Sequence, residues 1–255
     1  MVDYEVHGNV LVMTINRPEA KNAVNGEVAA GIEGGIDRLE DDESLWIGVL
    51  AAKGDVFSAG ADLKEINSGN AAALMTQRGG FGGIVYRERR KPIIAAVDGL
   101  ATAGGCEMVL ACDLVVASTR ASFGLAEVKR NLVAGAGGLF RLPRALPPNV
   151  AMEAILTATP IPAERAHQFG MVNRLTEPGR RSTARSPSPP RSPRTPRSRS
   201  GRPGGGQGRR RHGRGRAQGP DRPGLRRGPR LRGHQGRADR LHREAQAQLA
   251  GPLIR

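Results

Sequence analysis

The amino-acid composition changes abruptly after Pro178, and this change restricts where the chain can build a hydrophobic core. Residues 179–255 contain no Lys, Asn, Phe, Tyr, Trp, Met, Val or Cys and a single Ile. They consist mainly of Arg, Gly, Pro, Ala and Ser, a mixture that cannot bury enough apolar surface to offset the chain entropy lost on folding. The sequence therefore predicts a folded domain over residues 1–178 and a low-complexity, disordered basic tail over residues 179–255.

The positive charge of the chain is concentrated in this tail. The formal net charge is +15 at pH 7, and residues 179–255 hold 22 of the 39 Lys+Arg but 3 of the 24 Asp+Glu. Residues 1–178 are mildly acidic and so offer no general attraction for nucleic acid. An RNA-associated protein acting through its Arg-rich tail is one hypothesis. Against it, the tail has no aromatic ring on which a base could stack, so nucleic acid is not the expected partner.

A displaced reading frame is the other explanation for the tail. When residues 180–200 are back-translated with GC-rich codons, a neighbouring frame permits ALDGALALAAALAAHAPLAV, a sequence with the Ala and Leu content of a helix. Over residues 240–254 another frame permits AFTEKRKPNWQGR followed by a stop. The two stretches need different frames, so one slip does not account for the whole tail. The nucleotide sequence around codon 179 would decide between the explanations.

Residues 1–178 show strand and helix patterns in alternation. Residues 4–15 indicate a two-stranded hairpin around His7-Gly8, and residues 22–39 carry apolar residues at helical spacing with Asn22 as a candidate N-cap. A helix is also expected over residues 105–112. Short apolar runs typical of strands buried on both faces lie at residues 46–51, 92–97 and 114–117. This alternation predicts an α/β fold with right-handed crossovers.

The cysteine content and the lengths of the apolar runs indicate in which cellular compartment the protein is expected. Cys106 and Cys112 are too few for a disulfide framework, which favours reduced thiols in the cytoplasm. No apolar run approaches the ~18 residues of a membrane span, and no basic start is followed by an apolar leader. We therefore expect a cytoplasmic protein with no membrane partner.

Three glycine-containing segments follow predicted strands and could carry chemistry. Residues 57–62 (FSAGAD) form a turn that exposes backbone N–H groups. Residues 98–107 (DGLATAGGCE) lead into a helix starting at Gly104-Gly105, whose unpaired N–H groups would suit a developing oxyanion. Residues 122–127 (SFGLAE) precede the run VAGAGG at 133–138, which lacks the Lys-Ser/Thr of a phosphate loop. Nucleotide binding is therefore not expected.

Together these segments resemble the enoyl-CoA hydratase (crotonase) family. The strings FSAGADLKE, KPIIAAVDG, AGGCEMVLACDLVVAS and ASFGLAEVKR are signature stretches of that family, and NRPEAKNAV near the start also fits. The resemblance covers about residues 4–177. It implies a spiral of ββα units that binds acyl-CoA and assembles as a homotrimer or as a hexamer built from two trimers. Since the acyl-CoA is the substrate, the resemblance implies no cofactor and no metal.

The resemblance also implies which residues form the site. The two backbone N–H groups that hold the thioester oxygen fall on Ala59 and Gly104, and the two glutamates beside the reacting carbons fall on Glu107 and Glu127. Adding water syn across a conjugated thioester builds charge on the carbonyl oxygen, which two fixed donors stabilise. One carboxyl activates the water while the other handles the α-carbon proton. The residues expected to contact acyl-CoA are Ala59, Gly60, Ala61, Asp62 and Gly104.

Retention of both glutamates favours a hydratase, a carbon–oxygen lyase of fatty-acid β-oxidation. The alternatives are the enoyl-CoA isomerases and acyl-CoA hydrolases of the family, which vary at one or both positions. Ala103 stands where the family often has glycine, so its methyl group is expected to change the acyl site or the loop. The family also has C-terminal helices that cover the CoA and complete the subunit contacts. A chain ending in residues 179–255 as written is therefore expected to be impaired in activity and assembly.

Overall fold

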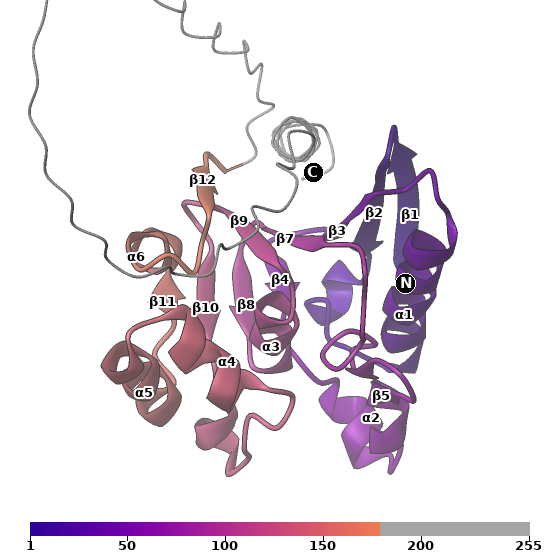
Figure 1. Ribbon diagram of the computed structural model, residues 1–255. Helices are drawn as coiled ribbons and strands as arrows, with labels where there is room; N and C mark the ends of the chain where they lie inside the picture. The colour runs from indigo at the N-terminus through magenta and orange to yellow at the C-terminus, as the bar shows by residue number, and fades with distance from the viewer. Residues whose placement is uncertain (179–255) are drawn as a thin grey trace, which may run out of the picture. The chain divides into compact units, whose positions relative to one another are not determined.

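The structure, a computed structural model, describes residues 1–178 (Figure 1). The predicted disordered tail and the question of its reading frame lie outside the described residues. The division of the chain after residue 178 therefore stays a prediction. None of the helices within residues 1–178 is long and apolar enough to cross a membrane.

The larger of two main sheets has six strands. In spatial order they are β1 (Val2–His7), β2 (Val10–Ile15), β3 (Ile47–Ala52), β7 (Ile93–Val97), β9 (Leu114–Ser118) and β12 (Arg174–Thr176). β1 and β2 form an antiparallel hairpin, and every later pairing is parallel. The hairpin and the three predicted apolar strands are thus confirmed. β3 and β7 are almost entirely buried, as parallel strands with continuous apolar runs usually are.

A second sheet receives one strand after each central strand of the first. Its strands are β4 (Val56–Ser58), β8 (Leu100–Thr102), β10 (Ser122–Gly124) and β11 (Ile161–Pro162), in the spatial order β11-β10-β8-β4. A helix then follows: α2 (Leu63–Asn67) after β4, α3 (Gly104–Leu110) after β8 and, beyond a loop, α4 (Gly138–Ala145) after β10. This repetition of two strands and a helix confirms the predicted α/β spiral of ββα units.

The remaining elements complete the described residues. A short hairpin pairs β5 (Met75–Thr76) with β6 (Gly80–Phe81), and α5 (Pro148–Thr157) and α6 (Ala163–Gln168) follow α4. Three 3₁₀ helices lie at η1 (Pro18–Ala20), η2 (Ala71–Leu74) and η3 (Glu127–Arg130).

The first long helix begins later than its sequence pattern predicts. α1 spans Gly26–Asp41, and its N-cap is Asn25, whose side chain accepts a hydrogen bond from the Val28 N–H at 3.0 Å. The prediction that Asn22 caps this helix is wrong. Asn22 is fully buried in a left-handed conformation (φ +52°), and its amide donates to the carbonyls of Lys53 and Val56, both at 2.7 Å. Asn tolerates this conformation, and its side chain here satisfies two buried carbonyls.

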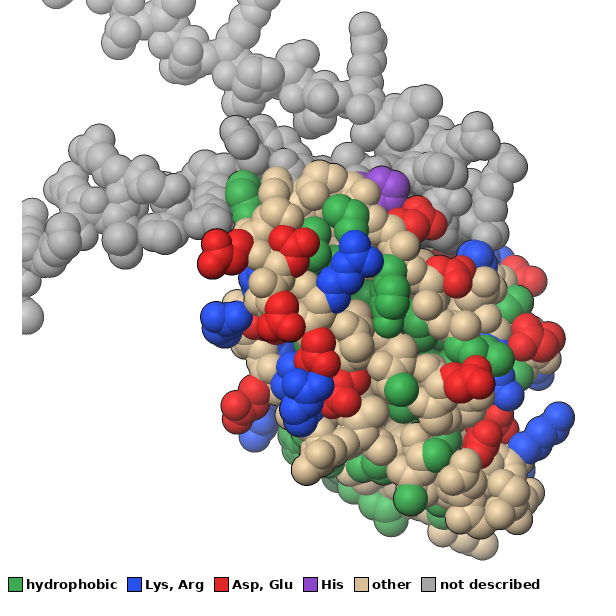
Figure 2. Space-filling model, turned by 90° about the vertical axis from the view of Figure 1, so that its right-hand side faces the viewer, with side chains coloured by type: hydrophobic (Ala, Val, Ile, Leu, Met, Phe, Trp, Pro, Cys, Tyr) green, Lys and Arg blue, Asp and Glu red, His purple; other side chains and the backbone are tan. Residues whose placement is uncertain are grey.

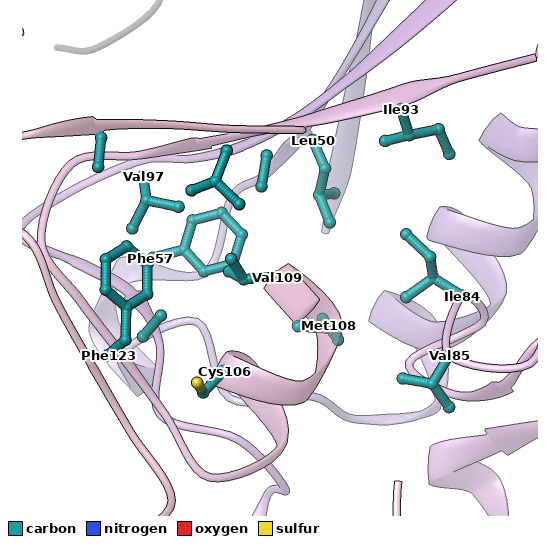
Figure 3. Close-up of a cluster of buried hydrophobic side chains, with 14 of the residues drawn as sticks. Leu50, Phe57, Ile84, Val85, Ile93, Val97, Cys106, Met108, Val109 and Phe123 are labelled. Atoms are coloured by element: carbon teal, nitrogen blue, oxygen red, sulfur yellow. The ribbon is translucent and has the colours of Figure 1, made fainter. Parts of the chain in front are cut away.

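The core between the large sheet and α3 fixes the first turn of that helix. In Figure 3, Leu50 points from the sheet towards Met108 and Val109 of α3, Val97 lies beside the Phe57 and Phe123 rings, and Ile93 lies above Ile84. All of these side chains are at most 3% exposed. Close packing of this kind holds a backbone rigidly, so the residues at the start of α3 have a well-defined position.

The surface that carries α1 and the β1–β2 hairpin mixes acidic and basic side chains (Figure 2). Asp37 of α1 pairs with Arg78 at 2.5 Å and with Arg87 at 2.6 Å, and Glu40 pairs with Arg90 at 2.9 Å. Interspersed charges do not form the continuous basic surface that binds a nucleic-acid backbone.

α1 lies close against the β1–β2 hairpin, and a pair of adjacent glycines tests this packing. A Cβ at Gly35 would lie 2.6 Å from Met13 Sδ, and Met13 is fully buried, whereas a Cβ at Gly34 would meet its nearest neighbour, Tyr4 Oη, at 3.6 Å. We expect Gly35→Ala to lower the free energy of unfolding by ~1–3 kcal/mol through overpacking. Gly34→Ala should raise it by ~0.5–1 kcal/mol, since alanine favours the helix.

Urea unfolding of the full chain, followed by the fluorescence of its one tryptophan, Trp46, measures both effects. Equal changes in the two variants would contradict the close contact between α1 and the hairpin.

Candidate active site

The loops that follow β4, β8 and β10 open onto one cavity. These three strands are parallel neighbours, so their carboxyl ends lie at the same edge of the sheet, where ligand sites of α/β folds commonly form. The cavity has a volume of about 1000 Å³. Six of the seven predicted site residues line it: Ala59, Ala61, Asp62, Gly104, Glu107 and Glu127. Gly60, the seventh, is buried and is not one of the lining residues.

Glu107 lies in the first turn of α3 and is 3% exposed. Its Oε1 accepts a hydrogen bond from the Gly138 N–H, at the start of α4, at 2.8 Å. Burial raises the pKa of Glu107 to about 7, and the nearby Glu127 adds to this rise although the Gly138 N–H opposes it. Near neutral pH this carboxyl can therefore give or take a proton, which suits a general acid or base.

Glu127, at the start of η3, is the second carboxyl on the cavity wall. Burial raises its pKa as well. Its Oε2 is buried and has no hydrogen-bond partner among the described residues. Buried polar atoms are nearly always paired, so an unpaired carboxyl oxygen at a cavity marks a position where a ligand or water would bind.

The backbone around Ala59 contradicts one predicted role. The Ala59 N–H donates to the Lys21 carbonyl at 3.0 Å, so it is not free to hold a thioester oxygen. On either side of Ala61, the Gly60 carbonyl accepts from the Val24 N–H at 2.7 Å and the Asp62 N–H donates to the Val24 carbonyl at 2.9 Å. In such a bridge the peptide groups of the central residue point away from the partner, so the Ala61 N–H faces the cavity. The structure therefore replaces Ala59 with Ala61 as the candidate donor.

Gly104 supplies the second free N–H group. Gly104 is the first residue of α3, so no preceding helical turn offers a carbonyl to accept a hydrogen bond from its N–H group. This N–H has no hydrogen-bond partner among residues 1–178. Gly60 has φ +87°, and a Cβ there would lie 2.9 Å from the Gly104 nitrogen. Glycine at this position lets the two loops meet, which brings the Ala61 and Gly104 N–H groups to the same part of the cavity.

Ala103, the departure from the family pattern, occupies an unusual backbone conformation on the cavity wall. Its φ of +51° with ψ of −129° is a region that L-residues other than glycine rarely adopt, at a typical energy of ~1–3 kcal/mol. The Ala103 N–H donates to the Gly124 carbonyl at 2.8 Å, and the paired strands β8 and β10 lead directly into this contact. The neighbouring β-structure therefore holds the strained residue in place.

Other reactive side chains have structural surroundings. Cys106 is fully buried, and burial raises the pKa of its thiol. His167 Nδ1 lies 2.8 Å from the Val172 carbonyl oxygen. No group of three or more His, Cys, Asp or Glu side chains within residues 1–178 is arranged to hold a metal ion.

The sequence analysis missed the apolar wall of the cavity. Several of its side chains are large, apolar and yet solvent-exposed: Leu63, Ile66, Met75, Leu132 and Val133. They come from two separate parts of the chain, one around α2 and β5 and the other after η3. Since loops carry no periodic pattern, no signal in the sequence marked this wall.

Comparison with known proteins identifies the family of this chain. A family model described as enoyl-CoA hydratase/isomerase matches residues 5–178. The chain belongs to the enoyl-CoA hydratase/isomerase family. The mevalonyl-coenzyme A hydratase of Aspergillus fumigatus is 40% identical to it over 171 residues, which are 66% of this chain and 63% of that protein. The short-chain-enoyl-CoA hydratase of Clostridium acetobutylicum is 38% identical over 178 residues, 68% of either chain. The matched part thus spans about two thirds of these relatives' lengths.

Solved structures of the family share the fold. The enoyl-CoA hydratase from Mycobacterium tuberculosis H37Rv superposes with a TM-score of 0.67 at 48% identity, covering 70% of this chain and 69% of that one. The carnitinyl-CoA hydratase from Mycobacterium avium gives a TM-score of 0.67 at 44% identity with the same coverage. These structures confirm the spiral of ββα units predicted from the family's signature stretches.

The raised pKa of Glu107 predicts a pH-dependent gain in stability on its removal. In the unfolded chain this carboxyl loses its proton near pH 4.5, but in the folded chain it keeps it until about pH 7. Between these values the folded state binds more protons, so its stability falls as the pH rises. We expect Glu107→Gln to raise the free energy of unfolding near pH 8 by up to about 3 kcal/mol, and to have little effect below pH 4.5.

Urea unfolding at the two pH values, with the exposed Glu153→Gln as the matched control, measures this effect. A gain that is the same at both pH values would contradict a raised pKa at Glu107.

Proposed function

We propose that the chain is an enoyl-CoA hydratase, which adds water reversibly and with syn stereochemistry to the double bond of a 2-enoyl-CoA thioester. One observation carries the proposal: the buried Glu107, the partly buried Glu127 and two backbone N–H groups without a partner among residues 1–178 border a single cavity. The N–H groups of Ala61 and Gly104 would hold the thioester oxygen as it gains charge, and Glu107 and Glu127 would move the protons.

The proton balance explains why both carboxyls are needed. Hydration places a hydroxyl on the β-carbon and a proton on the α-carbon. One carboxylate takes a proton from water while the other carboxyl, initially protonated, gives its proton to the α-carbon. The pair therefore holds one proton before and after the reaction. Burial raises the pKa values of both groups, and the nearby Glu127 raises that of Glu107 further, which favours a singly protonated pair near neutral pH.

We propose an acyl-CoA substrate with an apolar acyl chain and no separate cofactor or metal. The apolar side chains of Met75, Phe81 and Val133 on the cavity wall support this class of substrate. Relatives named for mevalonyl-CoA and carnitinyl-CoA indicate that the family also accepts acyl groups with polar substituents. Substrates of both kinds belong in the test.

We further propose that the protein acts in the cytoplasm in fatty-acid β-oxidation as a homotrimer or hexamer, provided that its C-terminal part matches the family. Exposed apolar side chains on α4 and α5 support an association through this side of the domain: Leu139, Phe140, Met152 and Leu156. Large exposed apolar groups that gather in one region commonly mark an interface.

Steady-state hydration of crotonyl-CoA, longer enoyl-CoAs and a hydroxylated enoyl-CoA tests the activity. The assay compares the chain as written with a frame-restored chain, whose C-terminus is re-encoded from the nucleotide sequence. We expect the frame-restored chain to hydrate enoyl-CoA and the chain as written to be much weaker. Double-bond migration or thioester cleavage without hydration would instead assign a sister activity. Salt-dependent RNA binding without any acyl-CoA reaction would favour the RNA hypothesis.

A further inference from the structure

A loop near the N-terminus forms the support on which the proposed oxyanion segment lies. Residues 17–24 contact residues 58–62 through backbone hydrogen bonds: the Lys21 carbonyl accepts from the Ala59 N–H, and Val24 bonds both neighbours of Ala61. The Ser58 hydroxyl also donates to the Asn22 carbonyl at 2.8 Å. The direction of the Ala61 N–H thus depends on a segment about 40 residues earlier in the sequence.

The Arg17 side chain also joins these two segments. Its Nη1 donates to Asp62 Oδ2 at 2.5 Å and to the Ala23 carbonyl at 3.1 Å, so a single nitrogen joins the supporting loop to the residue that follows Ala61. The Arg17 and Asp62 side chains are 15% and 9% exposed. A charge-assisted hydrogen bond is stronger and more directional than a neutral one, and solvent screens this one little.

Asp62 uses both carboxylate oxygens to hold the segment. Oδ2 accepts from Arg17, while Oδ1 accepts from the Lys64 N–H at 2.9 Å and so caps α2. Burial alone would raise the pKa of Asp62, but the hydrogen bond from Arg17 and the cap hold it below its usual value. The carboxylate therefore stays charged and remains bound to Arg17 across the neutral pH range.

We propose that Arg17 is a positioning residue for the oxyanion site. Its hydrogen bonds to Asp62 and to the Ala23 carbonyl hold Ala61 in the orientation that points the Ala61 N–H into the cavity. This inference rests on the proposed function, since it concerns the same thioester oxygen. Arg17 lies on the cavity wall but acts on the reaction through Asp62 and Ala61. Without Arg17, only the two backbone hydrogen bonds with Val24 would hold the Gly60–Ala61 peptide, beside the flexible Gly60.

The experiment measures hydrogen bonding to the thioester carbonyl through the absorption spectrum of a bound probe. The probe is 4-(dimethylamino)cinnamoyl-CoA, a conjugated thioester whose absorption moves to longer wavelength when its carbonyl oxygen accepts hydrogen bonds. It is bound to the full chain and to the Arg17→Met, Asp62→Asn and Arg17→Met/Asp62→Asn variants. Arg165→Met is the matched control, because it breaks an exposed Arg–Glu pair with Glu153 on another part of the surface.

We expect each single variant to lose at least half of the red shift while its Kd for the probe changes less than about 3-fold, and the control to keep the full shift. In the frame-restored chain kcat should fall ~10-fold or more with little change in KM, as expected when a catalytic group is misplaced. The double variant should be no worse than the poorer single variant, since both remove one shared contact.

Two outcomes would overturn the inference, and the second would also count against the proposed function. A full red shift in both Arg17→Met and Asp62→Asn would show that the pair does not orient Ala61, although the oxyanion site itself would stand. Bound probe with no red shift in the unaltered chain would reject the oxyanion site and this inference together. If Arg17→Met does not fold, Asp62→Asn decides, because its amide oxygen can still cap α2.

Discussion

Glu107→Gln and Glu127→Gln are each expected to lower the turnover of enoyl-CoA hydration by ~10²-fold or more while the domain stays folded. An amide has nearly the shape of the carboxyl but cannot exchange a proton. In Glu107→Gln the amide oxygen could still accept the Gly138 N–H bond, and the Glu127 Oε2 atom has no hydrogen-bond partner to lose among the described residues. The loss would therefore reflect proton transfer and not a change of structure.

Steady-state kinetics of the frame-restored chain measure the loss, and solvent deuterium exchange at the α-carbon of a saturated acyl-CoA shows which carboxyl handles that proton. Glu153→Gln, an exposed carboxyl on α5, is the matched control and should leave turnover unchanged. A variant at Glu107 or Glu127 that keeps normal turnover and normal exchange would remove that residue from the mechanism. The predicted gain in stability of Glu107→Gln at high pH separates lost chemistry from lost folding.

Gly60→Ala should lower kcat/KM by ~10²–10³, the loss typical of removing one oxyanion donor. Its methyl group would lie 2.9 Å from the Gly104 nitrogen and 3.1 Å from the Ala103 Cβ, so it would cover one proposed donor and push the two loops apart. The left-handed φ of +87° adds a backbone penalty of ~1 kcal/mol for a residue with a side chain.

Gly69→Ala provides a control with the same backbone penalty. Gly69 has φ +83°, and a Cβ there would meet nothing within 4 Å. Gly60→Ala should therefore lose more stability than Gly69→Ala in urea unfolding because of its added contact, and only Gly60→Ala should lose activity and the red shift of the bound thioester probe. Equal activity in the two variants would show that the Gly60–Gly104 contact does not form the oxyanion site.

Local patterns in the sequence are enough to establish several parts of the fold and of the site. The continuous apolar runs of β3 and β7 identify buried parallel strands, because such strands have no solvent-facing side to carry polar residues. The sequence also places Glu107 in the first turn of α3, since a glycine-rich loop leading into an apolar run sets the start of that helix. The family's signature stretches placed Glu107, Glu127 and Gly104, and the fold brings all three to one cavity.

Which groups are free to act is a property of the folded domain. Ala59 and Ala61 flank the same glycine and look equivalent in the sequence. In the fold, the Ala59 N–H donates to the Lys21 carbonyl, while the backbone bonds with Val24 turn the Ala61 N–H towards the cavity. The sequence pattern favours Asn22 as the cap of α1, but the Asn22 side chain donates to the carbonyls of Lys53 and Val56, and Asn25 caps the helix instead.

These choices depend on hydrogen bonds between residues far apart in the chain, 31 residues apart for Asn22 and Lys53 and 45 for Arg17 and Asp62. A local pattern reports which residues prefer a strand, a cap or a turn. It holds no information on which distant carbonyl will satisfy a given N–H group, because strand pairing and packing set that distance only when the whole domain folds.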